Sequence, residues 1–105
     1  MITLRQISFL VALAEEMNFT RAAARCHVTQ PTLSAGLREL EERLGVKLVE
    51  RTSRALLITE VGEQVVEEAR KLLDGARRIE TLAKAHLNPE EGDLRLGAIP
   101  TIGPY

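Results

Sequence analysis

Residues 23–34 read AARCHVTQPTLS, a pattern typical of a helix end, a brief turn and a second helix. Thr29 or Gln30 can open that second helix, and Pro31 stands where its missing N–H costs nothing. Leucines at positions 33, 37, 40 and 44 then recur at i, i+4, i+7 and i+11, which predicts one buried helical face. Gly45 is expected to end the helix as a C-terminal cap. Together these residues predict a helix-turn-helix unit.

The residues on either side of this unit complete a small fold. Upstream, apolar side chains at three- and four-residue spacing predict a helix over about residues 4–17. Thr20 is expected to cap the next, short helix over residues 21–26. Downstream, residues 47–50 and 55–58 are short extended runs joined by the polar, basic residues 51–54, which predicts a β-hairpin. Three helices and a two-stranded wing make a mainly α, winged helix-turn-helix fold.

A fourth and longer helix is expected to begin after Thr59 and to continue to about His86. Its apolar residues are spaced four, three, four, three and four, the heptad rhythm of a coiled coil. Such a helix extends roughly 40 Å, longer than a small domain needs for its own core. We therefore predict a homodimer through this linker helix, with the seam residues Val65, Ala69, Leu72, Ala76, Ile79 and Ala83. The alternative is a helix that folds back on its own domain.

These elements divide the chain into three expected segments: residues 1–58, residues 59–87 and residues 88–105. The first is the winged helix-turn-helix and the second is the linker helix. Pro89 and Gly92 are expected to end that helix in a polar hinge. Residues 93–99 alternate as a strand would, and we interpret them as the truncated start of a regulatory domain.

The composition limits the class of protein. The chain has 105 residues and a net charge of −1, with 45% hydrophobic and 28% charged residues, which is typical of one globular domain. No apolar run is long enough for a bilayer and no secretion signal leads the chain, so a cytoplasmic protein without a membrane partner is expected. A single cysteine allows no internal disulfide, and no Cys/His cluster has metal-ligand spacing. No metal and no cofactor is expected.

Charge is unevenly distributed along the chain. Residues 1–58 hold eight basic and six acidic side chains, whereas residues 59–105 hold six and nine. Residues 20–38 include three arginines and no carboxylate, and residues 51–59 are also free of acid. These two positive regions coincide with the helix-turn-helix and with the expected hairpin tip. Their position favours double-stranded DNA as the partner.

In a helix-turn-helix, the N-terminal residues of the second helix reach base edges in the major groove. Gln30 can pair with an adenine, and Pro31 or the Thr32 methyl group can pack on a thymine methyl. Arginines of the wing can enter a minor groove or hold phosphate. The predicted DNA-binding residues are Arg21, Thr29, Gln30, Pro31, Thr32, Ser34, Arg38, Arg51, Thr52 and Arg54. The alternative interpretation is an ordinary capped helix with a solvated face.

Catalytic chemistry is not indicated by any motif. Carboxylate pairs such as Glu15 and Glu16 are helical neighbours that point apart, and the two histidines are isolated. No glycine-rich loop precedes a helix in phosphate-binding order. Cys26 falls in a helical core position, which favours an apolar filler over a redox sensor. An enzyme is therefore not expected.

These motifs resemble the LysR-type transcriptional regulators. The matching residues are residues 23–34, Leu37, Leu40, Glu41, Leu44, Gly45, residues 48–51 and residues 59–62. The resemblance covers positions 1 to about 86. It implies a winged-helix head on a linker helix that dimerises antiparallel, a palindromic-type DNA operator, a homotetramer of the full-length protein and a C-terminal effector domain.

A finer resemblance is to the peroxide-sensing branch of that family. It is carried by residues 26–28 (CHV), residues 50–54 (ERTSR) and residues 96–105 (LGAIPTIGPY). The resemblance implies that Thr101 lies by the effector site and that the protein controls an oxidative-stress response. Two alternatives stay open: a LysR-type regulator that responds to a small metabolite, and a coiled-coil protein-interaction module without DNA binding.

Overall fold

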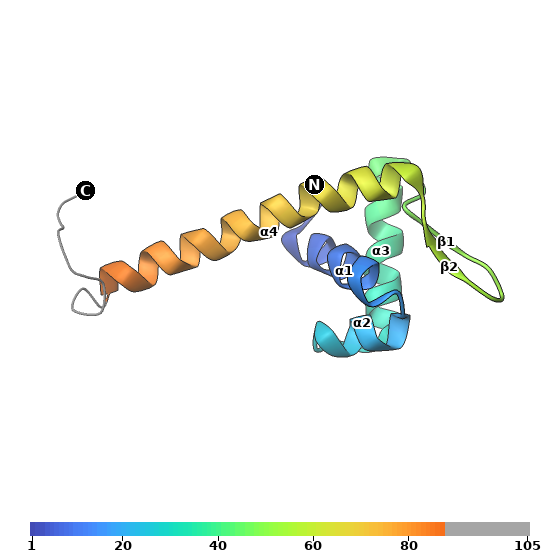
Figure 1. Ribbon diagram of the computed structural model, residues 1–105, viewed down its shortest axis with the longest axis horizontal. Helices are drawn as coiled ribbons and strands as arrows, with labels where there is room; N and C mark the ends of the chain where they lie inside the picture. Colours follow the sequence, from blue (N-terminus) through green and yellow to red (C-terminus); the bar gives the residue numbers. More distant parts are fainter. Residues whose placement is uncertain (88–105) are drawn as a thin grey trace. The chain divides into compact units, whose positions relative to one another are not determined.

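The computed structural model describes residues 1–87, so Thr101 and the expected start of a regulatory domain lie outside the described residues. The elements in chain order are α1 (Leu4–Glu16), α2 (Phe19–Arg25), α3 (Gln30–Leu44), β1 (Val49–Arg51), β2 (Leu56–Ile58) and α4 (Glu60–Leu87). Helices α1, α2 and α3 lie together, with the hairpin of β1 and β2 after α3 (Figure 1). This arrangement confirms the mainly α, winged helix-turn-helix fold.

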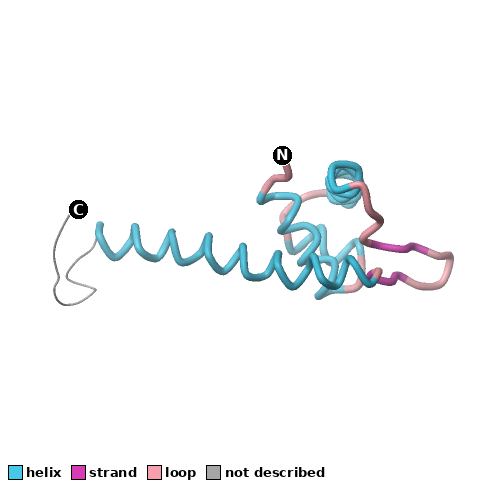
Figure 2. The backbone as a smooth tube through the Cα atoms, turned by 90° about the horizontal axis from the view of Figure 1, so that it is seen from above, coloured by secondary structure: helices cyan, strands magenta, loops and turns pink. Residues whose placement is uncertain are grey.

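The chain divides into two units after Leu73, and we call residues 1–73 the head. The head contains α1 to α3, the hairpin and the first half of α4, and the rest of α4 belongs to the second unit. Within the head, the two antiparallel strands pair Val49 with Ile58 and Arg51 with Leu56. The strands and the loop that joins them stand out from the helices as a narrow ribbon (Figure 2).

Polar caps set the start of each of the first three helices. Thr3 and Gln6 form a capping box at α1, and the Thr29 hydroxyl accepts a hydrogen bond from the Thr32 N–H at α3. The prediction that Thr20 caps α2 was wrong, because Asn18 precedes it and its Oδ1 accepts from the Arg21 N–H at 2.8 Å. Gly45 ends α3 with a φ of 74°, as predicted.

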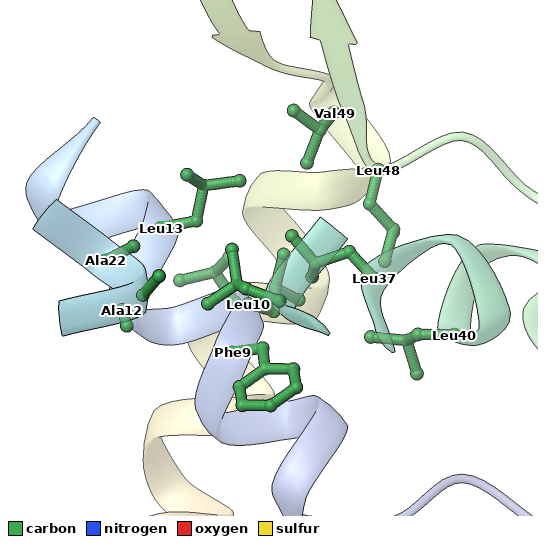
Figure 3. Packing of buried hydrophobic residues seen from close by; sticks show 12 residues of the cluster. Phe9, Leu10, Ala12, Leu13, Ala22, Leu37, Leu40, Leu48 and Val49 are labelled. Atoms are coloured by element: carbon green, nitrogen blue, oxygen red, sulfur yellow. The ribbon is translucent and has the colours of Figure 1, made fainter. Parts of the chain in front are cut away.

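The core of the head is aliphatic. The fully buried large side chains are Leu10, Leu13, Leu33, Leu40 and Leu48. They come from α1, from α3 and from the residue before β1, and Figure 3 shows most of them in one cluster with Phe9. Because the leucine stripe of α3 faces inward, the opposite face of that helix is left to solvent.

The first half of α4 packs on the head. Val66 joins the main core, and Ala69 packs with Ile7 and Val11 of α1. Ala69 is only 2% exposed and Val65 is half-buried against the core, so the first two predicted seam residues contact their own chain. Leu72 and Ile79, by contrast, are 50% and 68% exposed. The apolar stripe of α4 therefore covers the head at its start and faces solvent further along.

A small network of ion pairs connects three helices of the head. Glu15 of α1 pairs with Arg25 of α2 and with Arg70 of α4. The hydrogen bond from Arg25 holds the pKa of Glu15 below its ordinary value of 4.5. Burial raises this pKa and offsets only part of the effect. A carboxylate whose pKa is lowered by folding stabilises the fold above its unfolded pKa, and this stabilisation is lost as pH falls through the folded pKa.

We therefore expect Glu15→Gln to lower the free energy of unfolding near neutral pH. The difference from the wild type should shrink as the pH falls. Urea unfolding of both proteins from about pH 6 to about pH 3 would measure this, and the two free energies of unfolding should converge toward the acid end. The matched control is Glu67→Gln on the exposed face of α4. A constant difference between Glu15→Gln and the wild type across this range would contradict the assignment.

Candidate nucleic-acid interface

The N-terminal turn of α3 presents a polar surface to solvent. Thr29, Gln30, Pro31 and Thr32 are all exposed, because Leu33 directs its side chain into the core on the other side of the helix. Two more predicted residues of α3 follow, the half-buried Ser34 and the exposed Arg38. The structure thus brings the predicted residues of α3 together on the solvent side of this helix.

Residues of α2 and α1 position the beginning of this surface. The Thr20 hydroxyl donates to Gln30 Oε1 at 3.1 Å, which leaves the amide nitrogen of Gln30 free to donate. Thr20 was not among the predicted site residues, and the only signal for it is its place one helix upstream. Arg21 donates to the Glu16 carbonyl oxygen at 3.3 Å and pairs with the Glu16 carboxylate, although its side chain is 67% exposed.

The tip of the wing is organised by one hydroxyl group. Thr52 Oγ1 accepts from the Ala55 N–H at 2.9 Å and from the Arg54 N–H at 3.3 Å, and the hydroxyl donates to the Ala55 carbonyl oxygen. All of these hydrogen bonds of the Thr52 hydroxyl lie within the loop, and they fix the backbone of Arg54. Arg54 itself is exposed at the tip of the wing.

Arg51 does not lie at the tip, where the sequence prediction placed it. It is the last residue of β1, because its backbone pairs with Leu56 of β2. Its guanidinium lies 3.9 Å from the centre of the Phe19 ring, and Nη2 lies 3.4 Å from Ser34 Oγ. Arg51 thus contacts α2 and α3 from the base of the wing.

A carboxylate near the end of α3 sets where the wing begins. Glu41 Oε2 accepts from the backbone N–H groups of Leu48 and Val49 at 2.8 and 3.1 Å. At the other end of the hairpin, Thr59 donates from its backbone to the Leu48 carbonyl and from its hydroxyl to the Lys47 carbonyl. Glu41 was not among the predicted site residues, and no spacing in the sequence signals these two hydrogen bonds.

Cys26 packs against the core of the head and is half-buried, which confirms its interpretation as a filler. Burial raises the pKa of its thiol, which disfavours the reactive thiolate. Among residues 1–87, no three His, Cys, Asp or Glu side chains are grouped closely enough to hold a metal ion. No helix in this described part is both long and apolar enough to span a membrane.

A helix-turn-helix with a polar second helix beside a two-stranded wing defines the chain as a winged helix-turn-helix protein. Residues 4–63 match the family model for the bacterial regulatory helix-turn-helix protein of the lysR family. The match spans more than half of the chain and includes α1, α2, α3 and the wing. The chain belongs to the LysR family.

Several known proteins are similar to this chain. The DNA-binding transcriptional dual regulator OxyR of Escherichia coli is 47% identical over 102 residues, which cover 97% of this chain and 33% of OxyR. The HTH-type transcriptional regulator EstR of Acinetobacter baylyi is 50% identical over 103 residues, covering 98% of this chain and 34% of EstR. The chain thus spans about a third of the length of these relatives, which are named as regulators and not as enzymes.

A solved structure shows the same fold in contact with DNA. The BenM_DBD/benA site 1 DNA complex contains a protein that is 36% identical, with a TM-score of 0.75. The alignment covers 82% of this chain and 97% of that one.

Proposed function

We propose that this chain is the sequence-specific DNA-binding part of a transcriptional regulator. The regulator would respond to peroxide, as OxyR-like proteins do. The observation that carries the proposal is the exposed polar turn at the start of α3, in a head whose fold matches a LysR-family domain bound to DNA. In this proposal α3 enters the major groove and the wing lies on the backbone or in the minor groove.

The roles of the site residues follow from their positions. Gln30, Pro31, Thr32 and Ser34 face outward near the start of α3 and would contact base edges. Arg21, Thr29, Arg38 and Arg54 would contact phosphates, which set the affinity and its dependence on salt. Thr52, whose hydroxyl bonds lie within the wing tip, would act by orienting Arg54.

The proposed functional unit is a homodimer on a palindromic-type operator, with a homotetramer in a longer protein. Exposed apolar side chains along the later part of α4 support a helix-to-helix interface, since Ile79 is 68% and Leu82 is 71% exposed. Leu72, Ala76, Ile79 and Ala83 would form its seam. Ala69 is excluded from it by its burial in the head.

A LysR-type regulator that responds to a small metabolite is the second candidate. It stays open because EstR, whose name as a transcriptional regulator carries no reference to peroxide, is 50% identical to this chain, against 47% for OxyR. Both candidates use the same head for DNA and differ in the effector. Exposing bacteria to hydrogen peroxide in the presence and absence of the gene, and measuring transcripts, would separate them.

A matched pair of variants tests the proposed roles in DNA binding. We expect Gln30→Ala to relax the base preference at one operator position, with a loss of about 1–3 kcal/mol of discrimination. Arg54→Ala is expected to weaken specific and shuffled DNA alike and to reduce the slope of log affinity against log salt by about 0.9 for each bound chain. Fluorescence anisotropy with an operator selected from a random duplex library by the wild-type chain would measure both.

The two variants serve as controls for each other, because both residues are exposed and neither belongs to the core. Equal losses on selected and shuffled DNA for Gln30→Ala would show that Gln30 does not read a base.

A further inference from the structure

We propose that Arg51 is a positioning residue that sets the wing against the recognition helix α3, and that it does not bind phosphate itself. The inference rests on the proposed DNA-binding function and assigns a specific task to one residue within it. Arg51 would act on DNA through Ser34 and through the placement of the wing tip.

The contacts of Arg51 join three elements of the head. The guanidinium carbon of Arg51 lies 3.9 Å from the centre of the Phe19 ring at the start of α2, well within the range of a cation–π contact. Phe19 is itself packed against the main core, so the ring is a firm platform. The Nη2 group reaches Ser34 Oγ of α3 at 3.4 Å. One side chain of β1 therefore fixes the wing to both helices of the helix-turn-helix.

Arginine is better suited than lysine to make this pair of contacts at once. Its planar guanidinium stacks on a ring face while its edge donates hydrogen bonds, whereas the compact ammonium of lysine offers no plane. Arg51 and Ser34 also line a hollow between α3 and β1, together with Leu37, Lys47 and Val49. The guanidinium thus stands between the wing and α3, at the position where it can hold them at a fixed separation.

The contact with Arg51 also orients the Ser34 hydroxyl. A hydroxyl that accepts from Arg51 keeps its own proton to donate. Ser34 is therefore set to donate to an acceptor, such as a purine N7, a thymine O4 or a phosphate oxygen. Replacement of Arg51 would remove this fixed donor, and the Ser34 hydroxyl could then turn away from such an acceptor.

The test compares Arg51→Ala with the matched wing variant Arg54→Ala on selected and shuffled duplexes over a range of salt. We expect Arg51→Ala to lose about tenfold in affinity for the selected duplex, with less loss on the shuffled duplex and an unchanged salt slope. Arg51→Lys, which keeps the charge, should lose nearly as much. A salt slope reduced by about 0.9 for each bound chain in Arg51→Ala, or full affinity in Arg51→Lys, would overturn the proposal.

A second measurement needs no DNA. The Phe19 ring should shift the Arg51 side-chain proton resonances upfield, and Phe19→Leu should abolish the shift. Thermal unfolding of each variant checks that the head is folded. Unshifted Arg51 resonances would overturn the contact itself. If the Arg51 resonances are shifted but the protein binds neither duplex, Arg51 has no role in DNA binding. In that case the proposed function fails, while the contact between Arg51 and Phe19 is present.

Discussion

Gly62→Ala is expected to destabilise the head by about 3 kcal/mol, near the upper end of the cost of overpacking. A Cβ atom at position 62 would lie 2.2 Å from the Leu48 carbonyl oxygen and 2.9 Å from Ile58 Cγ2. The Leu48 carbonyl cannot easily retreat, because it accepts from the Thr59 N–H at 3.0 Å. The extra methyl group would therefore separate the start of α4 from the base of the wing.

The sign of this effect is informative because helix propensity predicts the opposite. Alanine in a helix interior is favoured over glycine by up to about 1 kcal/mol. Gly75→Ala on the same helix is the matched control, since its Cβ would meet only the end of the Arg78 side chain at 4.0 Å. Urea unfolding should show Gly62→Ala strongly destabilised and Gly75→Ala neutral or stabilised. Equal stability of the two variants would contradict the close approach at Gly62.

Glu41→Ala is expected to cost about 3 kcal/mol of stability and to loosen the wing. Its carboxylate accepts from the N–H groups of Leu48 and Val49, and both residues are buried. Removing the acceptor leaves two donors without a partner, each at a cost of about 1–3 kcal/mol before any water enters. Chemical denaturation and amide hydrogen exchange would measure the two consequences, and exchange at Leu48 and Val49 should accelerate most.

Two further variants separate the hydrogen bonds from the charge. Glu41→Gln keeps an acceptor oxygen and should lose only about 1 kcal/mol, because the bonds to a neutral oxygen are weaker. Glu42→Ala, at the exposed neighbouring position, should change stability by less than about 0.5 kcal/mol. A wing whose exchange is unaffected in Glu41→Ala would show that the carboxylate does not hold it.

Local patterns predicted most of the fold. The leucine stripe of α3, the cap at Gly45 and the basic loop of the hairpin each leave a mark in the sequence that maps directly onto one element. The start of α2 was placed too late because Asn18 and Thr20 are both good caps, and only the backbone geometry shows that Asn18 makes the bond. Periodicity alone also assigned Ala69 to a partner, whereas tertiary packing places it against α1.

The exposed residues of the interface were predictable by type, but their roles were not. Gln30 and Arg54 lie at the surface as their polarity indicates. The other roles depend on partners that are distant in the sequence. Arg51 contacts the ring of Phe19, and Thr20 donates a hydrogen bond to Gln30. Glu41 accepts from the Leu48 N–H across the turn that follows α3. Such contacts depend on the path of the chain in three dimensions, and no spacing rule in the sequence signals them.

The most direct test of DNA recognition is an anisotropy titration of the wild-type chain against the selected palindromic duplex and its shuffled counterpart, at two salt concentrations. Analytical ultracentrifugation of the complex would give the number of chains bound. We predict salt-sensitive binding that favours the selected duplex by at least about 10³-fold, with two chains per duplex. Equal affinity for the two duplexes, or no binding by a folded protein at low salt, would contradict the proposal that α3 reads DNA.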